Sequence, residues 1–558
     1  MSEEQFKQIN KRWSALKQER ASWLTHWADI SNNILPYNGR YLVSDRNKGG
    51  KRNNNIYDNT GTRALRVLTA GMMSGMTSPS RPWFLLSVAD TDLMKYQPVK
   101  LWLNAVSEQI SGVLAKSNCY RVLHGMYGEL GAFGTSPALI AEDYKNIIHL
   151  HPFTAGQYAI ATDHKGNVDT LYREFDTTVG NMVGEFGLEN CSNPVQIAYK
   201  RGKLDDWHTI IHAIEPRADR DTTKKDSINM PFSSVYLERS GGQNKLLRES
   251  GYKSFPCVVP RWETVGGDIY GVSPGMDALG DIKQLQMNQY RKSQVIDYQA
   301  NPPLQLPVAF KNREAQLFPG GFSYYDETTA AQGIRTAFEV KLDLNSVLVD
   351  IQDVRTRINS AFYSDLFLMI SQQAADGRMT ATEVAARNQE KLLMLGPAYD
   401  RLSNELLDPL VETVFERLLM ANMLPEPPEE LQGHGLNIEY VSMLAQAQQA
   451  VAINSIDRFV SSLGAVAQIN PNVLDKFDAD QWADIASEKI GVPPELIRAS
   501  NKVVMIRQER AAAQQQAEKQ QQMQEASQVL KNVGQTSTQP GTAAGDVLAA
   551  LKGKQQNG

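Results

Sequence analysis

The short motif in this sequence that most suggests catalysis is the segment Gly271–Gly275, which reads GVSPG. It matches the G-x-S-x-G pattern that surrounds the nucleophilic serine of many hydrolases. In those enzymes, the backbone N–H of the residue after the serine donates to the oxyanion hole. Here that residue is Pro274, and proline has no N–H. Because the motif lacks a donor that the reaction requires, we do not predict a hydrolase.

Histidine and cysteine spacings favour structural roles over metal or redox chemistry. His208 and His212 would share one face of a strand, but neither they nor the pair in 149–151 has an evident third ligand. The three cysteines are odd in number and widely spaced: Cys119, Cys191 and Cys257. The sequence also contains neither a G-x-x-x-x-G-K-[ST] loop nor a G-x-G-x-x-G loop to hold phosphates. We therefore predict no enzyme activity, no metal site and no cofactor.

Composition sets limits on the class of protein. The chain has 558 residues, 42% of them hydrophobic, which is enough for roughly three or four globular domains. Its net charge of −5 excludes a uniformly basic nucleic-acid-binding protein. No apolar run is long enough for a membrane span, and the sparse cysteines fit a reducing compartment. We expect synthesis in the cytosol and no membrane partner.

A series of helices between residues 274 and 424 organises the chain. The first is predicted over 274–300, and apolar residues recur there at spacings of three: Met276, Leu279, Ile282 and Leu285. The second half of this helix has little apolar stripe, so it needs either water or other subunits around it. A second helix is predicted over 342–370 because its apolar residues alternate spacings of three and four, as in helices packed lengthwise: Leu344, Val347, Ile351, Val354, Ile358 and Ala361.

A polar break at 371–379 separates the second helix from a third, kinked helix over 380–424. Thr380 and Glu383 form a capping box that starts the third helix. Pro397 lies within it, and a proline removes a helical hydrogen bond and bends the axis. These features predict a flexible loop between two rigid helices.

The segments on either side differ in character. Before residue 273 we predict an α+β body. It has one or two helices at 6–34, a helix that starts at Arg63 and ends in the segment 78–82, a helix at 101–114, and strands at 157–162, 168–175 and 207–214. Glycines and methionines in the helix that starts at Arg63 predict close helix packing. After residue 425 we predict a helical region to 502, a Gln-rich helix at 503–533 and a disordered tail at 534–558.

Six segments together resemble one known family, the portal (head-to-tail connector) proteins of tailed bacteriophages, in the podovirus-like branch. The segments occur in the family's order between roughly residues 6 and 425, which chance matches to short motifs rarely do. They are Gly71–Phe84, Gly128–Ser136, Gly156–Phe175, His212–Arg217, Pro260–Gly275 and Asp376–Glu390.

The resemblance implies a mostly helical α+β portal fold, assembled as a ring around an axial channel for double-stranded DNA. It divides the chain into regions similar to those of the family. These are an α+β wing at 1–273, stem helices at 274–300 and 342–370, a clip at 301–341, a tunnel loop at 371–379, a kinked wing helix at 380–424, a helical crown at 425–502, a short barrel helix at 503–533 and a tail at 534–558.

The resemblance also implies which residues meet DNA or docking partners. In the tunnel loop these are Gln372, Gln373, Asp376, Gly377, Arg378 and Met379. Candidates that line the channel along the stem are Lys283, Arg291, Lys292, Asp350 and Asp353. The clip candidates are Pro302, Pro303, Pro319, Gly320 and Gly321. Residues 326–376 carry eight acids and four bases, and in a ring this excess would keep DNA from adhering to the wall.

The partners implied by the resemblance are those of a portal. They are the other subunits of a homo-dodecamer, double-stranded DNA, the major capsid protein, a scaffolding protein, the terminase large subunit and a tail adaptor protein. The protein would then lie at the head-tail junction of the virion, would conduct DNA in packaging and ejection, and would nucleate procapsid assembly. The alternatives are a head-tail adaptor or internal virion protein, which should be shorter and lack paired stem helices, and, more remotely, a hydrolase.

Overall fold

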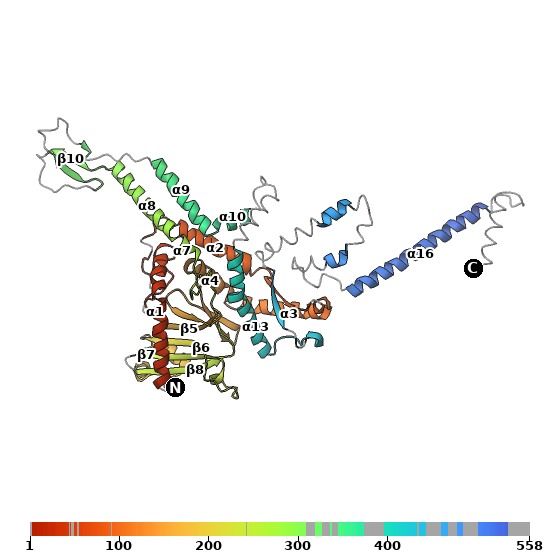
Figure 1. Cartoon of the computed structure of the whole chain (residues 1–558), viewed down its shortest axis with the longest axis horizontal. Helices are drawn as coiled ribbons and strands as arrows, with labels where there is room; N and C mark the ends of the chain where they lie inside the picture. The colour runs from red at the N-terminus through yellow and green to blue at the C-terminus, as the bar shows by residue number, and fades with distance from the viewer. Residues whose placement is uncertain are drawn as a thin grey trace.

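The computed structural model describes residues 3–43, 45, 49–52, 55–90, 92–240, 243–307, 318–325, 335–336, 344–372, 395–431, 433, 435–441, 459–466, 477–483 and 500–533. Figure 1 shows an α+β body from which two helices, α8 and α9, project side by side toward a small sheet that contains β10. This architecture confirms the mixed helix and sheet fold that the sequence predicts.

Four helices from the first part of the chain lie in the body. They are α1 (Glu3–Asn33), α2 (Thr60–Met76), α3 (Gln97–Lys116) and α4 (Cys119–Phe133). The segment at 6–34 is thus a single helix, and the helix predicted to end in the segment 78–82 ends at Met76, directly before it. Side chains from all four helices, including Trp27, Leu68, Val106 and Leu130, are buried in one hydrophobic core.

The body also contains a five-stranded antiparallel sheet with strand order β4-β5-β6-β7-β8. Its strands are β4 (Tyr158–Thr162), β5 (Val168–Thr178), β6 (Trp207–Pro216), β7 (Phe232–Ser240) and β8 (Gln243–Tyr252). Strands β4, β5 and β6 confirm the predictions from two-residue periodicity. Two short helices, α5 (Val179–Phe186) and α6 (Asn193–Lys200), follow β5 and pack on this sheet. A smaller sheet has the order β3-β2-β9, from β2 (Ala138–Asp143), β3 (Ile147–Pro152) and β9 (Cys257–Val258).

Glycines allow α2 to pack closely on its neighbours, as the sequence predicts. A Cβ atom on Gly71 would come within 2.2 Å of the Phe367 ring. In the same way, a Cβ atom on Gly131 of α4 would come within 2.8 Å of the Leu65 side chain. Since real Cβ atoms do not approach other atoms so closely, a larger residue at position 71 would displace the Phe367 ring, and one at position 131 would require the Leu65 side chain to move.

The helical arm consists of α8 (Leu279–Ala300) and α9 (Leu344–Ala361); α7 (Pro274–Asp277) precedes it and α10 (Ser364–Gln372) follows it. The prediction of a single helix over 342–370 is therefore wrong, because the helix is interrupted between α9 and α10. At the break, Tyr363 has φ of 55°, a left-handed conformation that a helix cannot contain. The break turns α10 onto α2, where Phe367 packs against Gly71.

The third helix is described from α12 (Gly396–Leu402), through a π-helical segment (Ser403–Leu407), to α13 (Asp408–Met420). Glu405 in the π-helical segment forms an ion pair with the buried Arg261, 2.6 Å from its Nη2 atom. Beyond α13, the strand β13 (Leu436–Tyr440) pairs antiparallel with β1 (Phe84–Val88). The sequence predicts only helices in this part of the chain, so β13 was missed.

The helix α16 (Ser500–Val533) confirms the Gln-rich helix predicted at 503–533. Of its described side chains, all but a few are exposed, as a helix without an apolar stripe requires.

Candidate subunit and nucleic-acid interface

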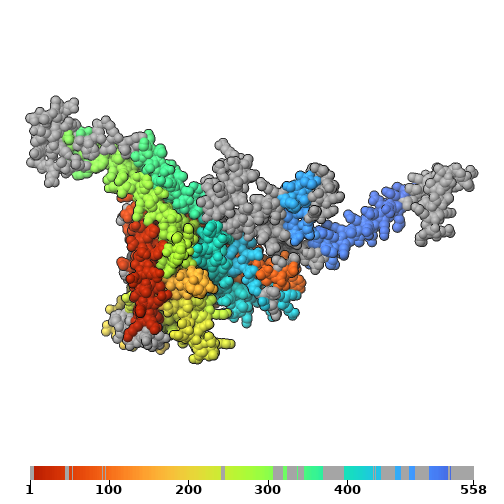
Figure 2. All heavy atoms as spheres, in the orientation of Figure 1, coloured from red at the N-terminus to blue at the C-terminus, as the bar shows by residue number. Residues whose placement is uncertain are grey.

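The helices α8 and α9 pack lengthwise on each other near the body. Leu279, Ile282 and Leu285 of α8 are buried, as are Val354 and Ile358 of α9. These are the residues whose three- and four-residue spacing predicts the paired helices. In Figure 2 the two helices extend from the body as one arm whose surface is open to solvent on the visible side.

A buried polar cluster attaches this arm to the body. The Asp58 carboxylate, just before α2, accepts hydrogen bonds from Arg355 Nη2 and Gln289 Nε2, both at 2.8 Å. Gln286 accepts hydrogen bonds from the backbone N–H groups of Tyr57 and Asp58 at 2.7 and 2.8 Å. It also donates to the Asp58 carbonyl at 2.8 Å. One acid thus joins α8, α9 and the start of α2.

The electrostatics of this cluster favour the ionised form of Asp58. Burial opposes ionisation, but hydrogen bonds from Thr60 and Arg355 outweigh it and hold the pKa of Asp58 below its usual value. Since the side chain of Asp58 is only 6% exposed, the charge is held by these donors and not by water. The cluster explains part of the polar surface of α8, because Gln286 and Gln289 face the body.

The charged residues predicted to line a channel lie on the surface of the arm. Lys283 forms an ion pair with Asp29 of α1 at 2.9 Å. Asp350 accepts a hydrogen bond from Asn288 at 2.6 Å, and Asp353 lies 3.7 Å from Arg357. Exposed Arg291 and partly exposed Lys292 complete the set. Three of these five charges thus already have partners within the chain.

The arm also exposes large apolar side chains, which sequence reasoning did not single out. Exposed fractions on α8 are 49% for Met287 and 43% for Tyr290, and Val349 of α9 reaches 70%. The ring of Tyr290 lies 5.5 Å from that of Tyr57, which is 60% exposed. The sequence did contain a signal for this exposed apolar surface, since apolar residues lie between polar ones in the second half of α8.

The described part of 301–341 forms a small three-stranded sheet at the far end of the arm. Its order is β11-β10-β12, from β10 (Leu304–Pro307), β11 (Phe322–Tyr325) and β12 (Arg335–Thr336). Pro302 and Pro303 separate α8 from β10, and Pro319, Gly320 and Gly321 turn the chain into β11. Gly320 has φ of +77°, which favours glycine, and its N–H donates to the Asn301 carbonyl at 2.6 Å.

The predicted loop at 371–379 lies almost entirely outside the described residues. Gln372 is the last residue of α10, so the first two residues of the predicted loop are helical. Gln373, Asp376, Gly377, Arg378 and Met379 are not among the residues that the structure describes.

The residues that suggested catalysis have structural roles. Ser273 is 1% exposed and caps α7: its Oγ accepts from the Met276 N–H at 3.1 Å and donates to the Ala132 carbonyl at 2.7 Å. A hydroxyl so placed cannot reach a substrate. His212 is buried, and its two ring nitrogens contact Arg173 Nε at 3.2 Å and Ser234 Oγ at 3.0 Å.

Two further features bear on the kind of site. Within the part of the chain that the structure describes, no group of His, Cys, Asp or Glu side chains is arranged to hold a metal ion. In the same part, no helix combines the length and the apolar character needed to cross a membrane.

Comparison with known proteins identifies relatives of the whole chain. The family described as bacteriophage head to tail connecting protein matches residues 6–497. A probable portal protein of Bordetella phage BPP-1 is 54% identical over 542 residues, which cover 97% of this chain and 98% of the relative. The portal protein of Salmonella phage epsilon15 is 43% identical over 557 residues and is covered completely, as is this chain.

Among solved structures, a chain from the neck of an empty gene transfer agent particle is a distant match. It has a TM-score of 0.36 and 11% identity, and the match covers 77% of this chain and 92% of the matched chain.

Proposed function

The chain belongs to the bacteriophage head to tail connecting protein family, and from this premise we propose that it is the subunit of a portal ring. Its relatives over the full length are named as portal proteins. Twelve copies would surround a channel at one capsid vertex, through which double-stranded DNA is packaged and later ejected. The full-length match disfavours a head-tail adaptor, which should be shorter.

The observation that carries the ring proposal is the apolar surface of the arm. Val349, Leu348 and Met287 are 70%, 49% and 49% exposed on helices that are otherwise polar or packed. Large exposed apolar side chains on two adjacent helices favour burial against another chain. In a ring, the arm of each subunit would lie against its neighbour's arm, and these side chains would be covered.

The remaining regions then take the roles expected of a portal. The arm would be the stem, and Arg291 and Lys292 would be the stem cations still available to DNA phosphates. The sheet of β10, β11 and β12, at the end of the arm, would be the clip that docks the terminase large subunit and later a tail adaptor protein. The major capsid protein and a scaffolding protein would contact the ring during procapsid assembly.

We also propose that residues 371–379 form a loop that projects into the channel. The support comes from the sequence, where the apolar spacing of the preceding helix gives way to small and polar residues and Gly377 provides a hinge. Arg378 is the loop's single cation, and around a ring it would contact phosphates without reading bases.

Electron microscopy and mass measurement of the purified protein test the ring. We expect annular particles with a central hole and a mass that is a multiple of the 62.1 kDa subunit, close to twelvefold. Compact monomers at every protein concentration would overturn the proposal. A filled particle without a hole would also contradict it, because the DNA channel requires one.

A further inference from the structure

The two helices of the arm are antiparallel, and two polar contacts fix their register. Asn288 of α8 donates a hydrogen bond to Asp350 of α9 at 2.6 Å. Asp281, seven residues earlier on α8, lies 3.4 Å from Arg357, seven residues later on α9. Residues 281 and 288 therefore mark the side of α8 that faces α9, and residues 350 and 357 mark the side of α9 that faces α8. Figure 1 shows the two helices side by side.

A large apolar residue lies on the outer flank of each helix. Tyr290 is two positions after Asn288, and Leu348 is two positions before Asp350. Successive residues of an α-helix are rotated by about 100°, so a step of two positions turns a side chain by about 200°. Tyr290 therefore points away from α9, and Leu348 points away from α8. The two residues are 43% and 49% exposed.

Tyr290 and Leu348 also lie at the same height along the arm. On antiparallel helices, two residues forward on α8 and two residues backward on α9 lead in the same direction, by about 3 Å each. Both steps start from the contact between Asn288 and Asp350 and lead away from the body. The arm thus carries, at one level, an apolar residue on each of two opposite flanks.

Contacts with the body agree with this placement of Tyr290. Its ring lies 5.5 Å from the ring of Tyr57, which is 60% exposed. Lys283, seven residues before Tyr290 and therefore on the same flank, forms an ion pair with Asp29 of α1 at 2.9 Å. Since both tyrosines remain exposed, the apolar surface of this flank extends from α8 onto the body.

Uncharged residues surround both apolar side chains along their helices. The neighbours of a residue on a helix surface are those three and four positions away. They are Gln286, Met287, Ser293 and Gln294 around Tyr290, and Leu344, Asn345, Ile351 and Gln352 around Leu348. The centres of protein interfaces are depleted in charged residues, so both flanks have a composition suited to such a centre.

Rotational symmetry decides which flanks can meet in a ring. With more than two subunits, the contact between neighbours is heterologous, so a surface of one subunit meets a different surface of the next. Contact between two like flanks would instead require a two-fold axis and would join subunits only in pairs. Because the two flanks are opposite each other and at one height, arms that stand side by side in a ring bring unlike flanks together.

We propose that Tyr290 packs against the neighbouring subunit's Leu348, and that this pair forms the centre of the contact between adjacent arms. The pairing depends on the portal ring proposed above, and it specifies the two surfaces that meet there. Met287, one turn from Tyr290, and Val349, next to Leu348, would lie at the edge of the same contact. Buried tyrosines at the centre of an interface often contribute a large share of the binding energy.

A pair of complementary charges tests this contact. Tyr290→Glu and Leu348→Lys each introduce a charge that the contact would bury against an apolar side chain. Each should raise the protein concentration at which half of the subunits form rings, measured by mass photometry, by about tenfold or more. In the double variant the two charges would face each other, and this concentration should return to within about threefold of the parent value.

The matched control combines Tyr290→Glu with Met420→Lys. Met420 is 65% exposed on α13, so the added lysine has the same charge but lies outside the arm. This combination should assemble as poorly as Tyr290→Glu alone. Equal recovery with either lysine, or no recovery with Leu348→Lys, would overturn the pairing.

Cysteine cross-linking identifies the flanks directly. The three native cysteines are buried, so cysteines introduced at the surface react selectively. The variant with both Tyr290→Cys and Leu348→Cys, treated with a short bis-maleimide, should give a covalent ladder that ends at the full ring on a denaturing gel. Each single variant should give no cross-linked product. A cross-linked dimer from a single variant would show that like flanks meet, and would overturn the pairing.

The results for the ring and for the pairing are distinguishable. Absence of annular particles from the parent protein would overturn the proposed function and the pairing with it. Annular particles from the parent and from the double cysteine variant, without a covalent ladder, would overturn the pairing and leave the ring.

Discussion

The ring of Phe367 in α10 occupies the space that a side chain at Gly71 in α2 would fill. A Cβ atom at position 71 would come within 2.2 Å of two carbons of that ring. The absence of a side chain at Gly71 therefore allows α10 to pack closely on α2.

Gly71→Ala should destabilise the protein by about 1–3 kcal/mol, the usual cost of overpacking a core. Urea unfolding, followed by circular dichroism, measures this change. The control is Gly125→Ala in α4, where nothing lies within 4 Å of the added Cβ atom. Alanine at that exposed helical position should be neutral or stabilising by up to about 1 kcal/mol. Equal effects of the two substitutions would show that the contact with Phe367 does not matter.

Asp58→Asn should weaken the attachment of the arm. The substitution removes the charge that accepts hydrogen bonds from Arg355 and Gln289, and we expect a loss of about 1–3 kcal/mol in unfolding free energy. Asp353→Asn is the control, because Asp353 is 65% exposed and its pair with Arg357 should contribute less than about 1 kcal/mol. Increased hydrogen exchange in α9 of the Asp58→Asn variant would show that the loss of stability arises where the arm attaches to the body. Unchanged stability would contradict the role of the cluster.

Because His212 is buried, we expect the folded protein to lose stability in mild acid. Burial lowers the pKa of its imidazole well below 6.5, so the unfolded chain binds a proton near pH 6.5 that the folded chain excludes. The contribution of His212 is therefore complete above about pH 6.5 and declines below it, by up to about 1.4 kcal/mol per pH unit. Unfolding in urea at about pH 7.5, 6.5 and 5.5 measures the slope.

A comparison of two variants isolates this effect. His212→Gln should reduce the slope below pH 6.5, whereas His164→Gln, at an exposed position, should leave it unchanged. Part of the slope should remain, because burial also lowers the pKa of His151, to about 4. Burial raises the pKa of Glu129, which acts with the opposite sign because its contribution is lost as the pH rises. Glu129 is present in both variants, so the difference between them belongs to His212. Identical slopes would refute the prediction.

Val349→Glu should prevent or weaken ring formation without unfolding the subunit. Val349 is 70% exposed in the single chain, so the substitution has little effect on the isolated fold, but burial of the new charge between arms would be costly. Mass photometry measures the proportion of rings. Val265→Glu, at a site 60% exposed on the body, is the matched control and should assemble normally. Normal rings from Val349→Glu would place the subunit interface elsewhere.

Arg378→Ala should leave rings and procapsids intact but alter packaging or retention of DNA. The reason is that Arg378 is the single cation of the proposed tunnel loop, and its loss removes one phosphate contact per subunit. The length of packaged DNA, measured by pulsed-field electrophoresis, is the readout. If full-length DNA is packaged and held as in the parent, the loop only connects two helices.

The sequence is sufficient to predict a helix or strand when its apolar spacing repeats within a short stretch of residues. The spacing of Leu279, Ile282 and Leu285 was sufficient to predict the buried face of α8, and all three side chains are buried. The break at Tyr363 was not predictable in this way, because tertiary packing imposes its positive φ and no glycine marks the position. Likewise β13 has five residues, and its partner among the described strands, β1, is far away in the sequence.

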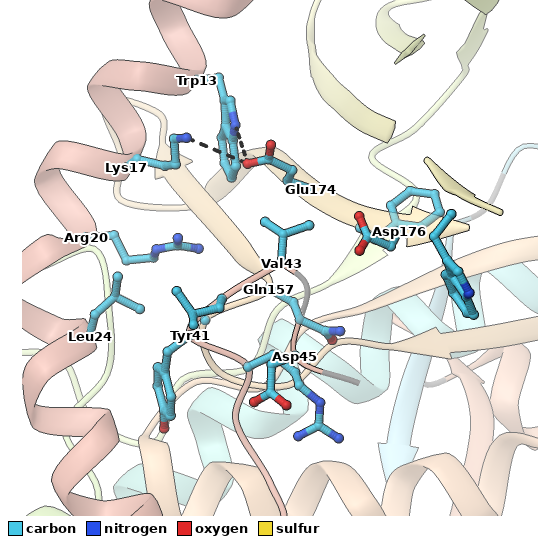
Figure 3. Close-up of a pocket in the computed structure, with 15 residues that line it drawn as sticks. Trp13, Lys17, Arg20, Leu24, Tyr41, Val43, Asp45, Gln157, Glu174 and Asp176 are labelled. Carbon is cyan, nitrogen blue, oxygen red and sulfur yellow. Dashed lines mark hydrogen bonds and ion pairs between the residues drawn. The ribbon is translucent and has the colours of Figure 1, made fainter. Parts of the chain in front are cut away.

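Arg20, which extends from α1 into the pocket that Figure 3 shows, is a buried cation that sequence reasoning did not single out. It occupies a position on the apolar stripe of α1, four residues after Leu16, where a core residue is expected. A cation at such a position is rarely fully buried, so the stripe itself could have drawn attention to Arg20. The sequence could not show that Glu174 is already shared by Lys17 and Arg239, because those contacts depend on the tertiary fold.

The pairing of β1 with β13 has a consequence for synthesis on the ribosome. Phe84 and its partner Tyr440 are separated by about 350 residues, which take roughly 20–70 s to translate at 5–20 residues per second. Throughout that interval β13, the described partner of β1, has not been synthesised, and an unpaired edge can pair with other nascent chains. Ribosomes that follow one another on the same message would carry such edges close together. Completion of the body is thus a late event of translation, and slow or stalled elongation before residue 440 would extend the period in which misassembly can occur.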